Sequence, residues 1–343
     1  MTPLLVLAAM HCLALGAAFL APYAPAEQTR SRPFAAPDRL RWVDERGEIY
    51  LRPFAYAGDP SSATGDGEKR RHRLRLLVRG TPYRVLGPFR SDLHLFGFDG
   101  PQRIFLLGSD GLGRDLLSRL LFGARVSLFA GLIATALSLT LGTVVGAVAG
   151  LRGGWVDGLA MRLCELFYAL PWLYLLLAVR AFLPLDLPPT RAFLLVVLVV
   201  GLVGWAKPAR LVRGAVLAAR EQGYVKAAEG LGAPARHLLR VHVLPQIMAI
   251  LWTQAAILAP RFILAEVTLS FLGLGMTEPV ASWGNLLAAL QRYHVLVSYW
   301  WMFVPAAALV VVVAWYQWLA RALVASGVAG GRVGAPLDGS QTA

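Results

Sequence analysis

Residues 224–245 read YVKAAEGLGAPARHLLRVHVLP and lie between two long apolar runs of the chain. The segment is basic, and its alanines favour a helix because alanine has the highest helix propensity. Basic segments that flank apolar runs are typical of the water-facing loops of membrane proteins. The sequence therefore predicts a short helical segment beside a membrane, short enough to dock onto another protein.

The composition of the whole chain also indicates a membrane protein. Of its 343 residues, 57% are hydrophobic and only 15% are charged, whereas about 25% of a soluble domain is charged. The net charge of +13 does not require nucleic acid as a partner, because many arginines flank apolar runs, where orientation explains them. Cys12 and Cys164 lie in apolar segments, so we expect two small buried side chains and neither a metal site nor a disulfide framework.

Six apolar runs predict an all-α polytopic membrane protein with about six transmembrane helices, since about 20 apolar residues cross a bilayer. Pro171 lies inside the third run, which membrane helices tolerate. Gly142, Gly146 and Gly150 in the second run place small residues on one helix face for close packing. The runs cover residues 4–20, 126–150, 161–183, 192–206, 244–265 and 300–324.

Residues 26–105 are polar and Arg-rich, and they predict a small β-rich insert between the first and second helices. Alternating strands at 40–43 and 48–54 flank one turn, and strands at 73–78 and 83–86 flank another, which predicts two hairpins. A Gly/Ser/Asp-rich stretch at 58–69 favours a mobile tip. The chain then divides into four regions: a first transmembrane helix (1–25), the insert (26–105), a helical core (106–325) and a flexible tail (326–343).

The distribution of basic residues predicts the orientation. The short loop 184–191 carries a single basic residue, Arg191. Positively charged loops stay in the cytoplasm, so we expect the loop 207–243 to be cytoplasmic and the insert to lie outside a bacterial plasma membrane. The basic residues of the loop are Lys207, Arg210, Arg213, Arg220, Lys226, Arg236 and Arg240.

The 224–245 segment resembles the EAA loop of bacterial ABC-transporter permeases, in which E-A-A is followed by three residues, a glycine, nine residues and I-x-L-P. Lys226 replaces the glutamate of that pattern, and His242 replaces the isoleucine. The resemblance implies a loop helix that fits a groove on a cytoplasmic ATPase. The positions implied to couple to the ATPase are Lys226, Ala227, Ala228, Glu229, Gly232, Leu244 and Pro245. We expect Glu229 to supply the displaced negative charge or to pair with Lys226.

Three further segments resemble dipeptide/oligopeptide-type permeases of the C type. Residues 107–128, LGSDGLGRDLLSRLLFGARVSL, resemble the segment before the second helix. Here we expect a tight turn capped by carboxylates, followed by an amphipathic interfacial helix that carries Arg114, Arg119 and Arg125. An ordinary interfacial helix is the alternative. The residues of this predicted interfacial motif are Asp110, Gly113, Arg114, Asp115 and Arg125.

Residues 266–286, EVTLSFLGLGMTEPVASWGNL, resemble the family's loop after the fifth helix, and residues 153–157, GGWVD, resemble the link between the second and third helices. Ordinary glycine turns are the alternative for both segments. The C-terminal sequence WLARALVASGVAGGRVGAPLDG departs from the usual tail of the family, so no contact of that tail can be transferred.

Charged residues inside the apolar runs are candidates for function because their burial is costly. Arg162 and Glu165 are spaced to pair on one helix face. Arg180 and Arg261 are expected near the outer ends of their helices, where their side chains can reach the interface. Glu165 is the only clear carboxylate within the predicted apolar runs.

The resemblance implies a membrane subunit of an ATP-driven importer, with peptides as the usual cargo of the family. Its implied partners are a second permease subunit, two ATP-binding subunits, an extracytoplasmic solute-binding protein and the lipid bilayer. The sequence contains no G-x-x-x-x-G-K-[ST] phosphate loop, so we expect no enzyme activity and no bound cofactor, with ATP and Mg on the partner ATPases. An ion-coupled secondary transporter and a membrane scaffold remain open as alternatives.

Overall fold

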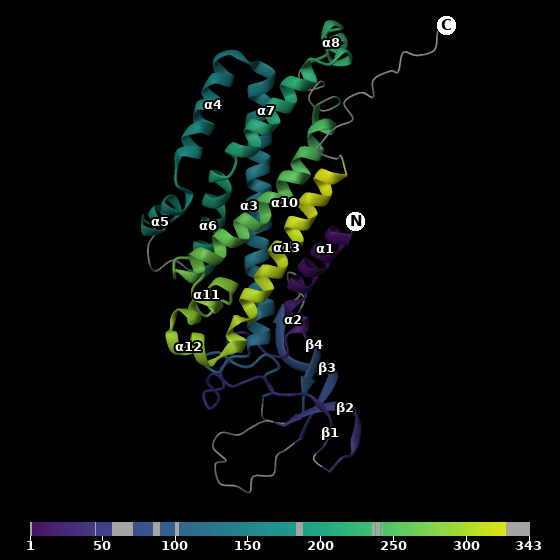
Figure 1. Ribbon diagram of the computed structural model, residues 1–343, viewed down its shortest axis with the longest axis vertical. Coiled ribbons are helices and arrows are strands. Elements are labelled where there is room, and N and C mark those ends of the chain that lie inside the picture. Colours follow the sequence, from purple (N-terminus) through teal and green to yellow (C-terminus); the bar gives the residue numbers. More distant parts are fainter. Residues whose placement is uncertain are drawn as a thin grey trace, which may run out of the picture.

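The computed structural model describes residues 2–44, 46–56, 71–84, 90–99, 103–182, 188–234, 237, 241 and 243–326. They form an elongated helical bundle with a small antiparallel sheet at one end (Figure 1). The predicted tip 58–69 and nearly all of the predicted tail 326–343 lie outside the described residues.

One long helix, α3, runs along the centre of the bundle, and other helices pack around it (Figure 1). It has 37 residues, which corresponds to about 55 Å at 1.5 Å per residue. The helices are α1 (Thr2–Leu15), α2 (Ala17–Leu20), α3 (Leu116–Arg152), α4 (Gly154–Ala169), α5 (Trp172–Phe182), α6 (Pro189–Val203), α7 (Ala206–Arg220), α8 (Gly223–Gly230), α10 (Leu244–Phe271), α11 (Trp283–Ala288), α12 (Tyr293–Ser298) and α13 (Val304–Ala325), with short 3₁₀ turns η2 (Ala289–Gln291) and η3 (Trp300–Phe303).

Within the described residues, four helical stretches are long and apolar enough to cross a membrane, fewer than the six predicted. They are Leu116–Arg152, Phe193–Arg220, Ile247–Phe271 and Trp300–Ala325. The first predicted run forms only a 14-residue helix, α1, followed by the short α2.

The third predicted run is not one helix. Leu170 adopts an extended conformation with ψ 122° and separates α4 from α5. The cause is Pro171, because a proline ring disfavours the helical conformation of the residue before it. The fourth run, in contrast, continues past its predicted end: α6 and α7 together form the stretch Phe193–Arg220. Residues 207–220, expected in a loop, are therefore helical.

The glycines of α3 pack against α7, as the predicted stripe of small residues requires. A Cβ atom at Gly146 would lie 2.3 Å from the carbonyl oxygen of Ala209, and one at Gly150 would lie 2.8 Å from Val216 Cβ. Such distances leave no room for a side chain. The two helices can approach this closely only because these positions carry glycine.

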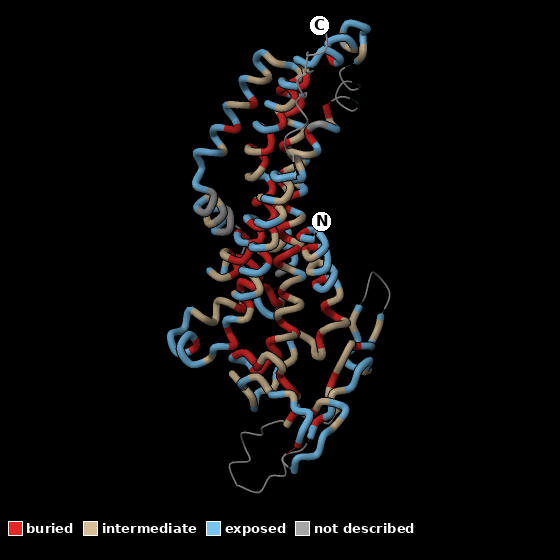
Figure 2. The backbone as a smooth tube through the Cα atoms, turned by 45° about the vertical axis from the view of Figure 1, so that its right-hand side comes forward, coloured by how far each residue is buried: buried red, intermediate tan, exposed pale blue. Residues whose placement is uncertain are grey.

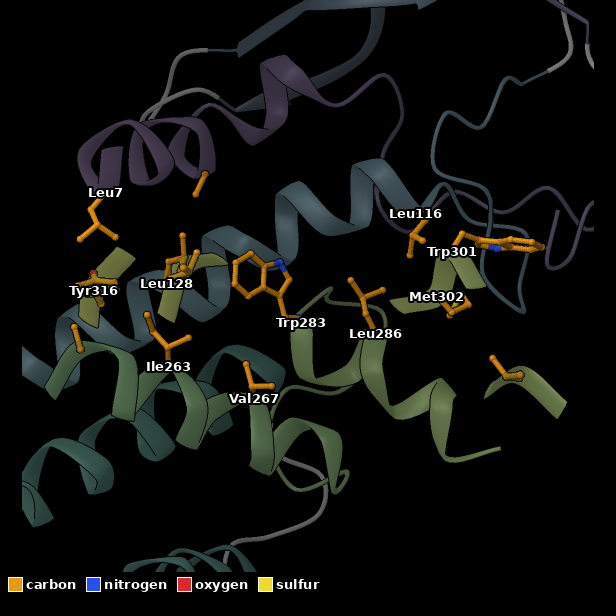
Figure 3. Close-up of a cluster of buried hydrophobic side chains, with 14 residues drawn as sticks. Leu7, Leu116, Leu128, Ile263, Val267, Trp283, Leu286, Trp301, Met302 and Tyr316 are labelled. Carbon is orange, nitrogen blue, oxygen red and sulfur yellow. The ribbon is translucent and has the colours of Figure 1, made fainter. Parts of the chain in front are cut away.

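The largest buried cluster of apolar side chains lies where α1, α3, α10, α11 and α13 meet (Figure 3). Trp283 and Leu286 of α11 extend into it, next to Ile263 and Val267 of α10. Buried residues follow the axis of the bundle, whereas the sheet is largely exposed or half-buried (Figure 2). The outer surface of the helices is apolar as well, with Val310 66% and Trp252 58% exposed, as expected where lipid takes the place of water.

The sheet has the strand order β1-β2-β3-β4, with antiparallel neighbours. The strands are β1 (Arg41–Val43), β2 (Ile49–Tyr56), β3 (Arg71–Arg84) and β4 (Arg90–Phe98). The first predicted hairpin is confirmed, since β1 pairs with β2 around Gly47, which has φ +80°.

The second predicted hairpin is wrong. Residues 79–82 do not form a turn but lie within the single strand β3, which pairs with β4. The register shifts between Arg79 and Tyr83, so these residues form an irregularity in the strand. Gly80 leaves space for the ring of His94, whose Cδ2 would lie 2.6 Å from a Cβ atom at that position. The glycine thus allows a close contact between strands rather than a reversal.

Candidate functional site

The 224–245 segment lies at the end of the bundle opposite the sheet (Figure 1). It begins in α8, which follows α7 after a two-residue turn, and it ends in the first turn of α10 with Leu244 and Pro245. Gly232 lies two residues beyond the end of α8 and has φ +83°, a conformation that favours glycine. Its neighbour Leu231 is 90% exposed, so an apolar side chain projects into solvent at this end.

The side of this segment that faces the bundle is anchored. Val225 of α8 is fully buried, as are Val243 and Ile247 at the start of α10. The last two belong to a buried cluster with Val212 and Val216 of α7. Apolar packing thus joins the start of α10 to α7, while Val225 is the buried residue of α8.

Lys226 pairs with Glu221, a partner that the sequence analysis did not predict. Its Nζ donates to Glu221 Oε2 at 2.7 Å, and both side chains are exposed. The hydrogen bond from Lys226 lowers the pKa of the Glu221 carboxyl. The side chain of Glu229 lies outside the described residues. Ala227 is exposed and Ala228 is half-buried, so small side chains line α8 beside this ion pair.

A second site lies at the sheet end, where two arginines bind two carboxylates. Arg114 donates through Nε to Asp110 at 2.7 Å and through both terminal nitrogens to Glu278 at 2.6 and 3.0 Å. Arg119 donates to the same Glu278 at 2.8 Å. The arginine side chains are 8% and 1% exposed, whereas that of Glu278 is 47% exposed. We call Asp110, Arg114, Arg119 and Glu278 the arginine network.

The turn predicted at residues 110–115 is confirmed. Asp110 Oδ1 accepts hydrogen bonds from the backbone N–H groups of Leu112 and Arg114, and Gly113 has φ +69°. Asp115 caps the N-terminus of α3, since its Oδ2 accepts from the backbone N–H of Ser118 at 2.7 Å. Burial raises the pKa of the Asp115 carboxyl to about 6, although the bonds from Ser118 oppose this shift.

The prediction of a separate amphipathic interfacial helix after this turn is wrong. Residues from Leu116 onward begin the long helix α3. Arg114 lies before the helix and Arg119 is fully buried in its first turn, whereas Arg125 is exposed. The arginines face different surroundings, because the arginine network removes two of them from the surface.

The arginine network joins two segments that the sequence singled out separately. Glu278 and Arg114 are 164 residues apart. Nearby, Ser282 caps α11 through a reciprocal bond pair with Asn285, and the indole of Trp283 donates to the Leu120 carbonyl at 3.0 Å. The S-W-G-N sequence therefore docks α11 onto the first turns of α3. Glu278 was not among the predicted site residues, and its only local signal is its place before Pro279.

The G-G-W-V-D segment links α4 to α7. Gly153 and Gly154 have φ +65° and +56°, which permits the reversal between α3 and α4. Asp157 accepts a bidentate hydrogen bond from the guanidinium of Arg213. This bond lowers the pKa of the Asp157 carboxyl. The segment thus fixes the position of α4 along α7.

The charged residues of the apolar helices differ from expectation in three respects. Arg162 and Glu165 are both exposed and form no ion pair with each other in the described part of the chain. Glu165 is not the sole carboxylate, because α10 extends beyond its predicted end and includes Glu266, which is 3% exposed and accepts from Ser270 Oγ at 2.7 Å. Arg261 lies ten residues before the end of α10. Cys12 is exposed, and only Cys164 is buried as expected.

These features define a polytopic helical membrane protein with an exposed loop segment at one end and a sheet at the other. A family model described as "Binding-protein-dependent transport system inner membrane component" matches residues 142–326. The chain belongs to this family of transport permeases, as its motifs predict.

Curated relatives with peptide-transport names support the assignment. The chain is 35% identical over 210 residues to the oligopeptide transport system permease protein OppC of Bacillus subtilis, covering 60% of this chain and 65% of that protein. It is 38% identical over 241 residues to a putative peptide permease protein of Brucella ovis, covering 69% and 78%. It is 38% identical over 229 residues to the dipeptide transport system permease protein DppC of Bacillus subtilis, covering 65% and 69%.

Proposed function

We propose that this chain is one of two membrane-spanning subunits of an ATP-driven peptide importer in a bacterial plasma membrane. It forms the translocation path with a second permease, receives cargo from an extracytoplasmic solute-binding protein, and is driven by two ATP-binding subunits. ATP and Mg are bound by those subunits. The names of the peptide-transporting relatives support this assignment.

The observation that carries the proposal is the placement of the 224–245 segment. It lies at the tip of the bundle, with Leu231 projecting into solvent and Val225 packed inward. An exposed surface on an anchored base suits a segment that another protein grips. With this end in the cytoplasm, the sheet at the opposite end lies outside.

The proposed mechanism is alternating access driven through α8. Closure of the ATPase dimer moves α8, and Val225, Val243 and Ile247 transmit the motion to α7 and α10. Cargo then passes between the two permeases. ATP shifts the populations of the inward- and outward-open states only because the docked ATPase binds them with different free energies.

The ion pair at α8 gives the ATPase contact its charge pattern. Lys226 reverses the acidic character of the family's leading glutamate, and its partner Glu221 restores a carboxylate beside it. Alternatively, Glu229 supplies the carboxylate that contacts the ATPase. The two can be separated by Glu221→Gln and Glu229→Gln in the assembled complex. We expect Glu221→Gln to reduce cargo-stimulated ATPase activity more than Glu229→Gln does. A larger reduction by Glu229→Gln would show that Glu229 supplies the carboxylate at the ATPase contact.

The sheet offers a contact for the solute-binding protein. Its outer surface exposes apolar side chains, with Leu51 98%, Ile49 82% and Leu76 70% exposed. Exposed apolar clusters of this kind mark protein contacts. Replacing residues 30–101 by a short linker should weaken binding of the solute-binding protein, and persistence of both uptake and affinity would remove this role.

Purification of the chain from its native membrane tests the central proposal. We expect it to copurify with a second permease and two ATPase subunits. A Leu231→Cys variant should cross-link to an ATPase subunit, while Leu51→Cys at the sheet should not. A chain that transports alone, driven by an ion gradient, would instead support a secondary transporter.

A further inference from the structure

A cavity of about 490 Å³ opens between the end of α4, the junction of α6 and α7, and the middle of α10. Its wall is mostly apolar, with Phe167, Leu258 and Phe262 among the lining residues. Two cationic side chains, Lys207 and Arg261, also line it. Ligand sites have this size and character: apolar walls with a few polar groups, in volumes of about 300–1,000 Å³.

Both cations lie deep in the membrane-spanning part of the chain. Arg261 lies close to the middle of the stretch Ile247–Phe271, and Lys207 lies at the middle of Phe193–Arg220. Arg261 is ten residues from the end of α10, which is about 15 Å or half the thickness of the hydrocarbon core. Lys207 lies in the first turn of α7 but inside the continuous stretch Phe193–Arg220, and Arg261 lies in the interior of α10 with its side chain exposed.

Within the described residues, neither cation has a carboxylate partner. Asp157 binds Arg213 and Glu266 accepts from Ser270, while Glu165, two residues before the lining residue Phe167, is exposed and has no ion pair within the described residues. The next arginine along α7, Arg210, lies over the ring of Tyr168 at 5.5 Å and adds further positive charge beside the cavity. The cavity is therefore cationic as well as apolar.

Lipid cannot cover two unpaired cations at this depth, because a charge at the bilayer centre is costly and such residues face water-filled cavities or paths. We propose that this cavity is a stretch of the translocation path and that Lys207 and Arg261 receive the carboxylate of a peptide cargo. This inference rests on the proposed importer function, and it specifies in addition that the cargo carries a negative charge. An apolar wall beside the two cations suits a small molecule with one anionic end and apolar side chains.

Thiol labelling in the assembled complex tests the cavity without knowledge of the cargo. Thr268 lines the cavity, so Thr268→Cys is treated with an anionic and a cationic methanethiosulfonate reagent, and mass spectrometry assigns the label to position 268. The measured quantity is the ratio of the anionic to the cationic labelling rate. We expect Lys207→Gln together with Arg261→Gln to lower this ratio by about tenfold, since both charges act across a low-dielectric wall.

Arg321→Gln is the matched control, because Arg321 is an exposed arginine on α13 and does not line the cavity. It should leave the ratio unchanged. Two results overturn the proposal. A ratio that is insensitive to Lys207 and Arg261 shows that they do not act on the cavity. Failure of both reagents to label the Thr268→Cys variant in the assembled complex shows that the cavity is filled, for example by a carboxylate side chain of the second permease.

Uptake separates this inference from the proposed function. In proteoliposomes with the full complex, ATP-dependent uptake of trialanine is compared with that of trialanine amide, which lacks the carboxylate. We expect the double variant to lose most of the preference for the free carboxylate, whereas Arg321→Gln keeps it. Unchanged preference in the double variant overturns the inference. Absence of ATP-dependent uptake by the parental complex would contradict the proposed importer function only. The labelling ratio would then test whether Lys207 and Arg261 act on the cavity.

Discussion

Glu278 binds two arginines that have almost no contact with solvent. Arg114 and Arg119 both donate to it, so its removal leaves buried positive charge opposite Asp110 alone. Breaking a buried ion pair costs about 3–5 kcal/mol, and the partial exposure of Glu278 reduces that figure.

We therefore expect Glu278→Gln to destabilise the chain by about 1–3 kcal/mol, measured as a lower melting temperature of the purified protein in detergent. Glu165→Gln is the control, because Glu165 is exposed and forms no ion pair within the described residues. Equal melting temperatures for the two variants would show that the arginine network adds nothing to stability.

Asp115 gives a stability effect that depends on pH. Burial raises the pKa of its carboxyl from 3.8 to about 6 in the folded chain. The neutral acid is favoured in the folded state, so its contribution to stability is present below about pH 4 and is lost as the pH rises through about 6. Asparagine mimics the neutral acid and still caps a helix.

The melting temperature of Asp115→Asn relative to the parental chain should therefore rise between pH 4.5 and pH 7. Asp115→Ala, which loses the bond to Ser118 as well, should be less stable than Asp115→Asn at both pH values by about 1 kcal/mol. A difference between Asp115→Asn and the parental chain that stays constant over this range would show that the carboxyl is ionised throughout.

Among the helices, the contact of α3 with α7 depends on glycine. A Cβ atom at Gly146 would lie 2.3 Å from a backbone oxygen of α7, which cannot rotate away. Gly146→Ala should separate the helices and cost about 1–3 kcal/mol by overpacking.

Gly158→Ala on α4 is the matched substitution, because nothing lies within 4 Å of a Cβ atom there. It should be neutral or stabilise the chain by about 0.5–1 kcal/mol through helix propensity. Melting temperatures of the two variants, measured side by side, check both expectations. Equal effects would mean that the α3–α7 contact tolerates a wider spacing.

Local sequence predicted those elements whose signals are local. The β1–β2 hairpin and the Asp110 turn follow from glycine and carboxylates at short spacing. The same reasoning failed at Gly80, because a glycine two residues before a proline is compatible with a turn and with an irregular strand. Only the ring of His94, 14 residues further on, decides between them.

The ends of the apolar helices were predictable in part. Leu170 takes the conformation that a following proline favours, but membrane helices often tolerate prolines, so sequence could not decide whether the run breaks. The arginine network and the cavity join residues that are far apart in sequence, such as Arg114 and Glu278 or Lys207 and Arg261. Their meeting depends on the packing of whole helices, which no local pattern specifies.

At the scale of the whole molecule, α8 and the sheet occupy opposite ends of the bundle (Figure 1). The chain should therefore present the two ends to opposite sides of the membrane. In right-side-out vesicles, a membrane-impermeant maleimide should label Leu51→Cys directly and Leu231→Cys only after permeabilisation. These two residues are 98% and 90% exposed, so burial does not confuse the comparison. Labelling of both from the same side would contradict the proposed orientation.

Because α3 is one continuous helix, the direction in which side chains point at one end fixes the direction in which they point at the other. Asp115 and the arginine network fix its rotation at one end, and Gly146 and Gly150 must face α7 toward the other. Each added residue turns everything beyond it by about 100°, since a helix has 3.6 residues per turn. An insertion of one residue near Ser138 would swing the glycines away from α7. About seven residues, or two full turns, is the smallest change in length that nearly restores the phase.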